Sequence, residues 1–210
     1  DYGKATVLHW DTKNGATIET LLSSKAPLES RQWYVHAGNT DITARVLPDG
    51  GTQASTTVRN EQGNPLLQTD PLGRQTKITY AANGIDPIKV EQKSAGGWDS
   101  LAQLTWNQQH RLLAIKNAAG QTTKYSYNSA GQLTARTGPN NLSTRYQYDQ
   151  QGQLSRIINA AGRPQASYQY DRQGNLASSS DSEGYTVKHE YDALNRITQA
   201  SYPDGTRTEI

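Results

Sequence analysis

The chain has 210 residues, of which only 33% are hydrophobic, and its aromatic residues are 12 Tyr and 4 Trp with no Phe. Cys is absent, which excludes disulfide bridges and zinc–thiolate sites. Twenty-one Lys and Arg are balanced by 19 Asp and Glu without a run of one sign, and no apolar run is long enough to cross a bilayer. We therefore expect no nucleic-acid partner and no membrane span.

An aromatic residue recurs along the chain and serves as the anchor of a repeat. The anchors are Trp10, Tyr34, Arg59, Tyr80, Trp106, Tyr127, Tyr148, Tyr170 and Tyr191. Their spacing is irregular over residues 1–105 and settles to 21 or 22 residues over residues 106–210. The sequence predicts a single array over residues 1–210, with about nine units of 21–26 residues. Because it begins at Asp1 without Met and stops at Ile210 in mid-pattern, we expect a piece of a longer chain.

A first turn is predicted four residues after each anchor. Those positions hold Asn14, Gly38, Gly63, Gly84, His110, Gly131, Gly152, Gly174 and Asn195. In "YDQQG" the side chain of Asp149 can accept from backbone N–H groups two residues on, and Gly152 can adopt a positive φ. Asp171 and Asp192 hold the same place after their anchors. This combination of an Asp and a later Gly or Asn predicts a type I turn that closes with a left-handed residue.

A second turn signal follows ten residues later. It comprises Gly73, Gly120, Asn141, Gly162, Gly184 and Gly205, and it is lost in the first, second and fourth repeats. The segments between the two turns have a period of two, which is typical of strands. In "QTTKYSY", Tyr125 and Tyr127 share one face and Lys124 and Ser126 share the other. We predict an all-β meander of hairpins with one aromatic face and one wet face.

The unit G-x5-Y-x-Y-[DN]-x2-G-x-L-x7-G resembles the YD repeat of the Rhs family, which is also found in encapsulating components of insecticidal toxin complexes and in teneurins. The resemblance is close from Gly120 to Gly205 and extends loosely back to Trp10. It implies a YD-repeat hairpin meander that forms an open, curved, spiralling sheet, a segment of a hollow β shell. The structural repeat anchors it implies are Tyr127, Tyr148, Tyr170, Tyr191, Asp149, Asp171, Asp192, Gly131, Gly152, Gly174, Gly120, Gly162, Gly184 and Gly205.

The function implied by this resemblance is structural and not enzymatic. In the family the shell encloses a toxic C-terminal domain, so the implied partners are the remainder of the parent chain and an enclosed toxin polypeptide, and the implied location is secreted or on the cell surface. The family's processing site resembles a paired "DPxG" arrangement. Here "DPLG" occurs once, at Asp70 to Gly73, where the repeat already predicts a turn.

Candidate chemistry outside the repeat is sparse. His9, His36, His110 and His189 stand in different registers without a metal-ligand spacing, so we expect no metal, no cofactor and no catalytic residues. The alternative function is a carbohydrate-binding or cell-adhesion surface, because bacterial wall-binding repeats also use aromatic hairpins of similar length. We also expect the open C-terminal edge of the sheet to allow edge-to-edge self-association.

Overall fold

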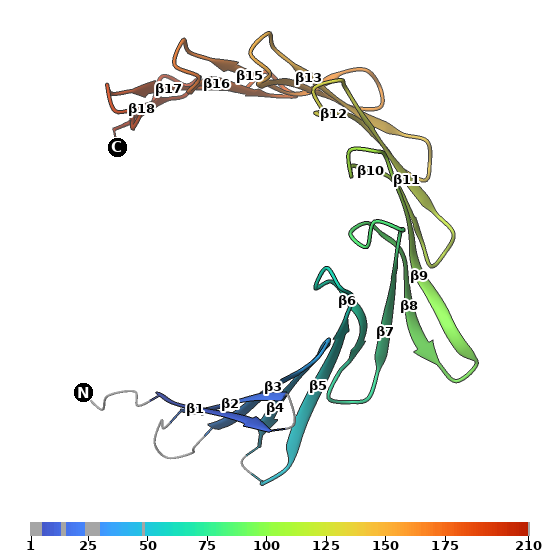
Figure 1. Cartoon of the computed structure of the whole chain (residues 1–210). Coiled ribbons are helices and arrows are strands. Elements are labelled where there is room, and N and C mark those ends of the chain that lie inside the picture. Colours follow the sequence, from blue (N-terminus) through green and yellow to red (C-terminus); the bar gives the residue numbers. More distant parts are fainter. Residues whose placement is uncertain (1–5, 14–15, 24–29, 48, 210) are drawn as a thin grey trace. The chain divides into compact units, whose positions relative to one another are not determined.

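A computed structural model of the chain describes residues 6–13, 16–23, 30–47 and 49–209 (Figure 1). All regular elements in these residues are β-strands, which confirms the all-β prediction. The chain divides into two compact units, Asp1–Gln121 and Thr122–Ile210. The first turn predicted at Asn14 lies outside the described residues.

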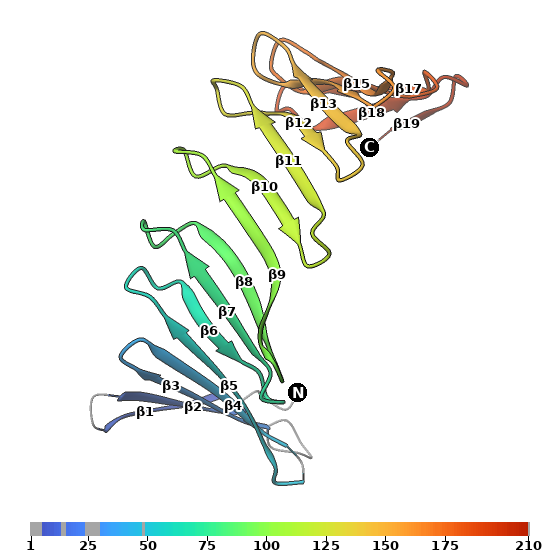
Figure 2. The same cartoon turned by 90° about the vertical axis from the view of Figure 1, so that its right-hand side faces the viewer.

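The first unit is an antiparallel meander. Its strands are β1 (Thr6–Lys13), β2 (Ala16–Ser23), β3 (Ser30–Ala37), β4 (Thr40–Val46), β5 (Thr52–Arg59), β6 (Pro65–Thr69), β7 (Gln75–Tyr80), β8 (Pro87–Ser94), β9 (Gly97–Trp106) and β10 (Leu112–Asn117). Within this unit, strands that are consecutive in the chain contact each other, and β1 contacts β2 alone among the described strands. Figure 2 shows β5 to β9 side by side with reversals at alternate ends.

The second unit repeats this arrangement with shorter strands. They are β11 (Thr122–Tyr127), β12 (Leu133–Thr137), β13 (Ser143–Tyr148), β14 (Leu154–Ile158), β15 (Pro164–Tyr170), β16 (Leu176–Asp181), β17 (Thr186–Tyr191), β18 (Ile197–Ser201) and β19 (Arg207–Glu209). Neighbours in the chain pair antiparallel throughout, and the last strand contacts β18 alone within the described part of this unit. The meander is therefore an open sheet within the unit.

The first turn of each repeat closes through a left-handed residue. Between β13 and β14 the N–H of Gly152 donates to the carbonyl of Asp149 at 3.1 Å, and the N–H of Asp149 donates to the carbonyl of Gln153 at 2.9 Å. Gly152 has φ of 82°, and the register shifts between Gln147 and Tyr148, as in a bulge that follows a type I turn. All eight described first-turn positions have positive φ; they are Gly38, Gly63, Gly84, His110, Gly131, Gly152, Gly174 and Asn195.

The second turns follow the same rule. Positive φ occurs at Gly73, Gly120, Asn141, Gly162, Gly184 and Gly205. The second repeat lacks a glycine at the expected place, and its turn is made instead by Gly50, whose φ is 84°. In the fourth repeat β8 and β9 run on to a hairpin that ends at the pair Ser94 and Gly97. In the second and fourth repeats, where the second signal was lost, the reversal has therefore shifted.

Burial alternates along the strands, as the period of two predicts. In β13, Tyr146 and Tyr148 are half-buried whereas Arg145 and Gln147 are exposed. The core is thin, because Ala200, at 5% exposure, is the one buried hydrophobic residue among those whose side chains the structure describes. The aromatic face is thus partly exposed to solvent. This environment suits Tyr, because its ring packs while its hydroxyl forms a hydrogen bond.

Replacing Gly162 by Val should lower the free energy of unfolding by about 1–3 kcal/mol, because a β-branched residue is strained at positive φ. Gly162 has φ of 78°, and an added Cβ would meet no atom within 4 Å, so the loss reports backbone strain and not a clash. Urea unfolding measures the change. Gly162→Asn is the matched control and should cost much less, since Asn tolerates this conformation. Equal losses for the two variants would contradict the assignment.

Candidate functional site

Five anchor aromatics connect their repeats to the repeat before. The hydroxyl of Tyr148 donates to the backbone carbonyl of Leu133 at 2.9 Å, six residues after the preceding anchor. The same bond recurs from Tyr170 to Leu154, from Tyr191 to Leu176 and from Tyr80 to Pro65, and from the indole Nε1 of Trp106 to Pro87, at 2.7 to 3.1 Å. Burial raises the pKa of the Tyr148 and Tyr170 hydroxyls, which keeps them protonated as donors. Tyr127 occupies the equivalent half-buried position in β11.

An aspartate directly after the anchor shapes the first turn. Oδ1 of Asp149 accepts from the backbone N–H groups of Gln151 at 3.0 Å and Gln153 at 2.8 Å. Asp171 and Asp192 accept from the corresponding groups of their own turns.

These turn hydrogen bonds favour the charged carboxylate. The backbone N–H and side chain of Arg196 hold the pKa of Asp192 below its ordinary value. Burial acts to raise the pKa of Asp171, but hydrogen bonds from Asn175 and Gln173 outweigh it, so that pKa is also lowered.

Amide side chains join the first turns of neighbouring repeats. Nε2 of Gln132 donates to the carbonyl of Gly152 at 2.6 Å, and Nε2 of Gln153 donates to the carbonyl of Gly174 at 3.0 Å. Asn175 likewise reaches Oδ1 of Asn195 at 2.9 Å. The predictions missed these residues. The sequence contains a signal for these links, because a Gln or Asn follows the first-turn glycine in "GQL" (131–133), "GQL" (152–154) and "GNL" (174–176).

Arg59 occupies an anchor position without an aromatic ring. Its Nε bonds Oδ2 of Asp41, and its Nη1 donates to the carbonyl of Gly63 at 2.9 Å. Asp41 is 8% exposed and also accepts from the hydroxyl of Tyr34 at 3.0 Å and contacts Nδ1 of His36 at 2.6 Å. A charged network therefore replaces the ring of this repeat.

His110 stands where other repeats have Gly or Asn. Its φ is 58°, and its Nδ1 lies 2.8 Å from Oδ2 of the buried Asp86. Asn83 donates to the same carboxylate oxygen at 2.7 Å. The histidine lowers the pKa of Asp86. His110 is thus a non-glycine residue in the left-handed region, where such residues are uncommon, and it contacts a buried carboxylate there.

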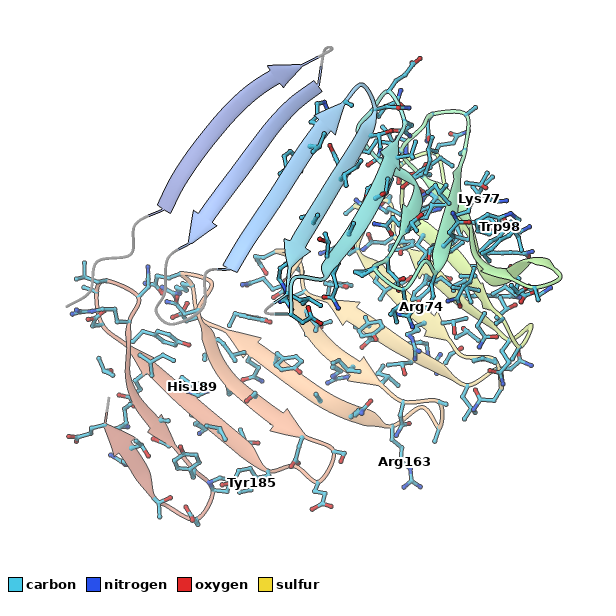
Figure 3. All side chains as sticks on the ribbon, turned by 90° about the horizontal axis from the view of Figure 1, so that it is seen from below. Arg74, Lys77, Trp98, Arg163, Tyr185 and His189 are labelled. Carbon is cyan, nitrogen blue, oxygen red and sulfur yellow. The ribbon has the colours of Figure 1, made fainter. Side chains whose placement is uncertain are left out.

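The "DPLG" segment lies in a turn and His189 lies in a strand. In "DPLG", Oδ1 of Asp70 accepts from the N–H groups of Leu72 and Arg74, both at 2.9 Å, so this segment is an ordinary second turn. His189 lies on the half-buried face of β17 in the slot of a tyrosine, and its Nδ1 is buried without a hydrogen-bond partner in the described structure (Figure 3).

The described residues hold no group of three or more His, Asp or Glu side chains placed for a metal ion. One polar recess of about 520 Å³ is lined by residues of β5 to β8 and the turn between β6 and β7. Its carboxylate is Asp70, which is paired with Arg74 at 2.6 Å, so the recess lacks the two opposed carboxylates that a glycosidase needs. No helix that could cross a membrane occurs in the part of the chain that the structure covers.

Comparison with known proteins identifies the repeat. The RHS Repeat family pattern matches residues 106–140, 127–164 and 170–207. No curated protein matches the chain in sequence.

Solved structures share the fold at low sequence identity. The crystal structure of TcdB2-TccC3-Cdc42 has a TM-score of 0.64 at 14% identity, with 97% of this chain and 14% of that chain covered. The crystal structure of TcdB2-TccC3 has a TM-score of 0.64 at 14% identity, with 92% and 15% covered. This chain therefore spans about one seventh of the length of the chains it matches.

Tyr170→Phe should lower the free energy of unfolding by about 0.5–1.5 kcal/mol, because it removes the donor to the carbonyl of Leu154 and leaves the ring in place. Thermal and urea unfolding measure the loss. Tyr168→Phe is the control, since the structure gives the hydroxyl of this half-buried tyrosine in the same strand no hydrogen bond. A loss at Tyr168 as large as at Tyr170 would show that the bond to the preceding repeat is not the cause.

The stability of the first unit should fall in acid because of Asp41. Its pKa is lowered from the ordinary 3.8 to about 2, first by the hydrogen bond with His36 and then by that with Arg59. A pKa lowered by folding means that the stabilisation is complete above the unfolded value and is lost as pH falls through the folded value. The loss between these limits should be about 2 kcal/mol.

Urea unfolding as a function of pH checks this prediction. Asp41→Asn should be less stable at pH 5 and should show a smaller further decrease between pH 4 and pH 2 than the unsubstituted chain. Parallel pH profiles for the two proteins would contradict the assignment.

Proposed function

Residues 106–164 and 170–207 match the RHS Repeat family, and on that premise we propose that the chain is a non-catalytic wall segment of a shell that encloses a polypeptide. The observation that carries the proposal is the repeated hydrogen bond from an anchor aromatic to the preceding repeat. It joins a hairpin to the repeat before it through the aromatic residue that recurs in the repeat. A structure built in this way extends as a wall and does not converge on a site.

Two further observations support a wall. Every contact between described strands joins strands that are consecutive within their unit, as expected for a sheet that grows by adding hairpins. Over nearly all of its own length, the chain is similar to about one seventh of the much longer chains in the crystal structures of TcdB2-TccC3-Cdc42 and TcdB2-TccC3. We extend the proposal to residues 1–210 as one array, irregular over 1–105 and regular over 106–210.

The contents of the shell follow from the family. We propose that the parent protein encloses a toxic C-terminal domain, and that these residues keep it apart from the producing cell until the protein has been exported. The implied location is outside the cell or on its surface. The partners are then the rest of the parent chain and the enclosed polypeptide, and the work of the wall is steric.

Protease protection in the parent protein tests enclosure. The polypeptide that follows the repeats should resist trypsin while the wall is intact and should be digested at least about tenfold faster in Tyr148→Ala/Tyr170→Ala, because cleavage tracks the population of the opened state. Gln147→Ala, at an exposed position of β13, is the control and should leave digestion unchanged. Equal digestion in all three proteins would overturn enclosure.

A glycan-binding assay tests the adhesive alternative. Residues 1–210 should show no saturable binding to an array of neutral and acidic glycans, because the anchor rings are half-buried and their polar tips are engaged by backbone carbonyls. Selective binding to one glycan, together with an unprotected C-terminal polypeptide, would replace the wall by an adhesive surface.

A further inference from the structure

One face of strands β7 to β10 collects lysines. Cross-strand partners share a face, and the register pairs Lys77 with Glu91 and Lys93 with Trp98. It also places Lys89 and Lys116 on either side of Gln103. We call this surface the basic face; it consists of Lys77, Lys89, Glu91, Lys93, Trp98 and Lys116, all within the first unit.

A buried carboxylate organises two of these lysines. Glu91 is 5% exposed and lies 2.6 Å from the ammonium of Lys89 and 3.0 Å from that of Lys77. The hydrogen bonds from Lys89 and then Lys77 lower the pKa of Glu91, so the carboxylate stays charged and the two ammonium groups are held beside it. An ammonium has three N–H donors, and each of these lysines donates one hydrogen bond to Glu91.

The indole ring of Trp98 also attracts two of the lysines, Lys77 and Lys93. The Nζ of Lys77 is 4.6 Å and the Nζ of Lys93 is 5.2 Å from the centre of the indole ring, within the range of cation–π attraction. Figure 3 shows Lys77 beside Trp98. The ring is therefore engaged by the protein's own cations. A sugar ring or an unstacked base would first have to displace them in order to stack on it.

The basic face concentrates charge. Four lysines against one glutamate give a net charge of +3, which exceeds the +2 of the entire chain. Lys93 and Lys116 are exposed, and neither has an acidic partner among the described residues. Such unneutralised charge on the middle of a sheet attracts an anionic partner that lies across the strands.

We infer that the basic face binds an acidic polypeptide segment, whose carboxylates take up the ammonium groups of Lys93 and Lys116. Glu91 shows the geometry in which this surface receives a carboxylate, between two lysines at hydrogen-bond distance. The occupied indole ring disfavours polysaccharides and single-stranded nucleic acids, which rely on stacking. That the segment belongs to the enclosed chain rests on the proposed function.

Fluorescence anisotropy with residues 1–210 tests this inference, using a labelled peptide of alternating Glu and Ser. The peptide should bind saturably and more weakly as salt is added, whereas a peptide of alternating Gln and Ser should not bind. Lys93→Gln/Lys116→Gln should weaken binding about tenfold, because two exposed ion pairs are lost. The matched control is Lys124→Gln/Lys188→Gln, which removes the same charge from exposed positions of β11 and β17 and should change affinity less than about twofold.

Three results would overturn the inference. They are the absence of saturable binding, equal weakening in the two double variants, and tighter binding of polygalacturonate or a single-stranded oligonucleotide of equal charge. The result of the peptide-binding experiment is independent of the result of the protease-protection experiment. A protected C-terminal polypeptide without peptide binding removes only this inference, and peptide binding without protection removes only enclosure.

Discussion

The described hairpins that follow an anchor depend on one backbone constraint, a left-handed residue four positions after that anchor. Gly152, at φ of 82°, turns the chain and shifts the register by one residue, so that Tyr148 faces Leu154 across the hairpin. The anchor lies on the half-buried face of β13, and its hydroxyl reaches the preceding repeat. A first turn of different length would change the residue that faces the anchor across the hairpin.

The composition reflects a wall that is one sheet thick. A sheet with a single half-buried face has no interior for large apolar side chains, and the described residues include no fully buried large side chain. An aromatic residue with a polar tip suits such a sheet, because the anchor rings of Tyr80, Tyr148, Tyr170 and Tyr191 each end at a backbone carbonyl that accepts a hydrogen bond. The chain accordingly has 12 Tyr and no Phe.

Turns and strand faces could be predicted from the sequence because both depend on local chemistry. Gly and Asn mark left-handed positions, and a period of two marks the faces. The exceptions required long-range information. Arg59 at an anchor and His110 at a first turn become intelligible only through Asp41 and Asp86, which are 18 and 24 residues earlier in the chain.

The basic face could not be predicted for a related reason. The register that brings Lys93 opposite Trp98 depends on the β8–β9 hairpin, where the second turn signal is missing and a bulge intervenes. The amide links between turns, by contrast, were visible in the sequence as the residue after each first-turn Gly. They were overlooked because a polar residue beside a turn is also what solvent exposure predicts.

Contacts confined to consecutive strands have a consequence for how such a protein can change in evolution. A hairpin inserted between two others meets the same carbonyl on one side and supplies the same carbonyl on the other, so no existing interface needs to be redesigned. Gene duplication or loss of one unit would change the length of the sheet in steps while the hydrogen bonds between neighbouring repeats are preserved. The extent of the sheet can in this way change without a loss of stability in the repeats that remain, and without a new fold.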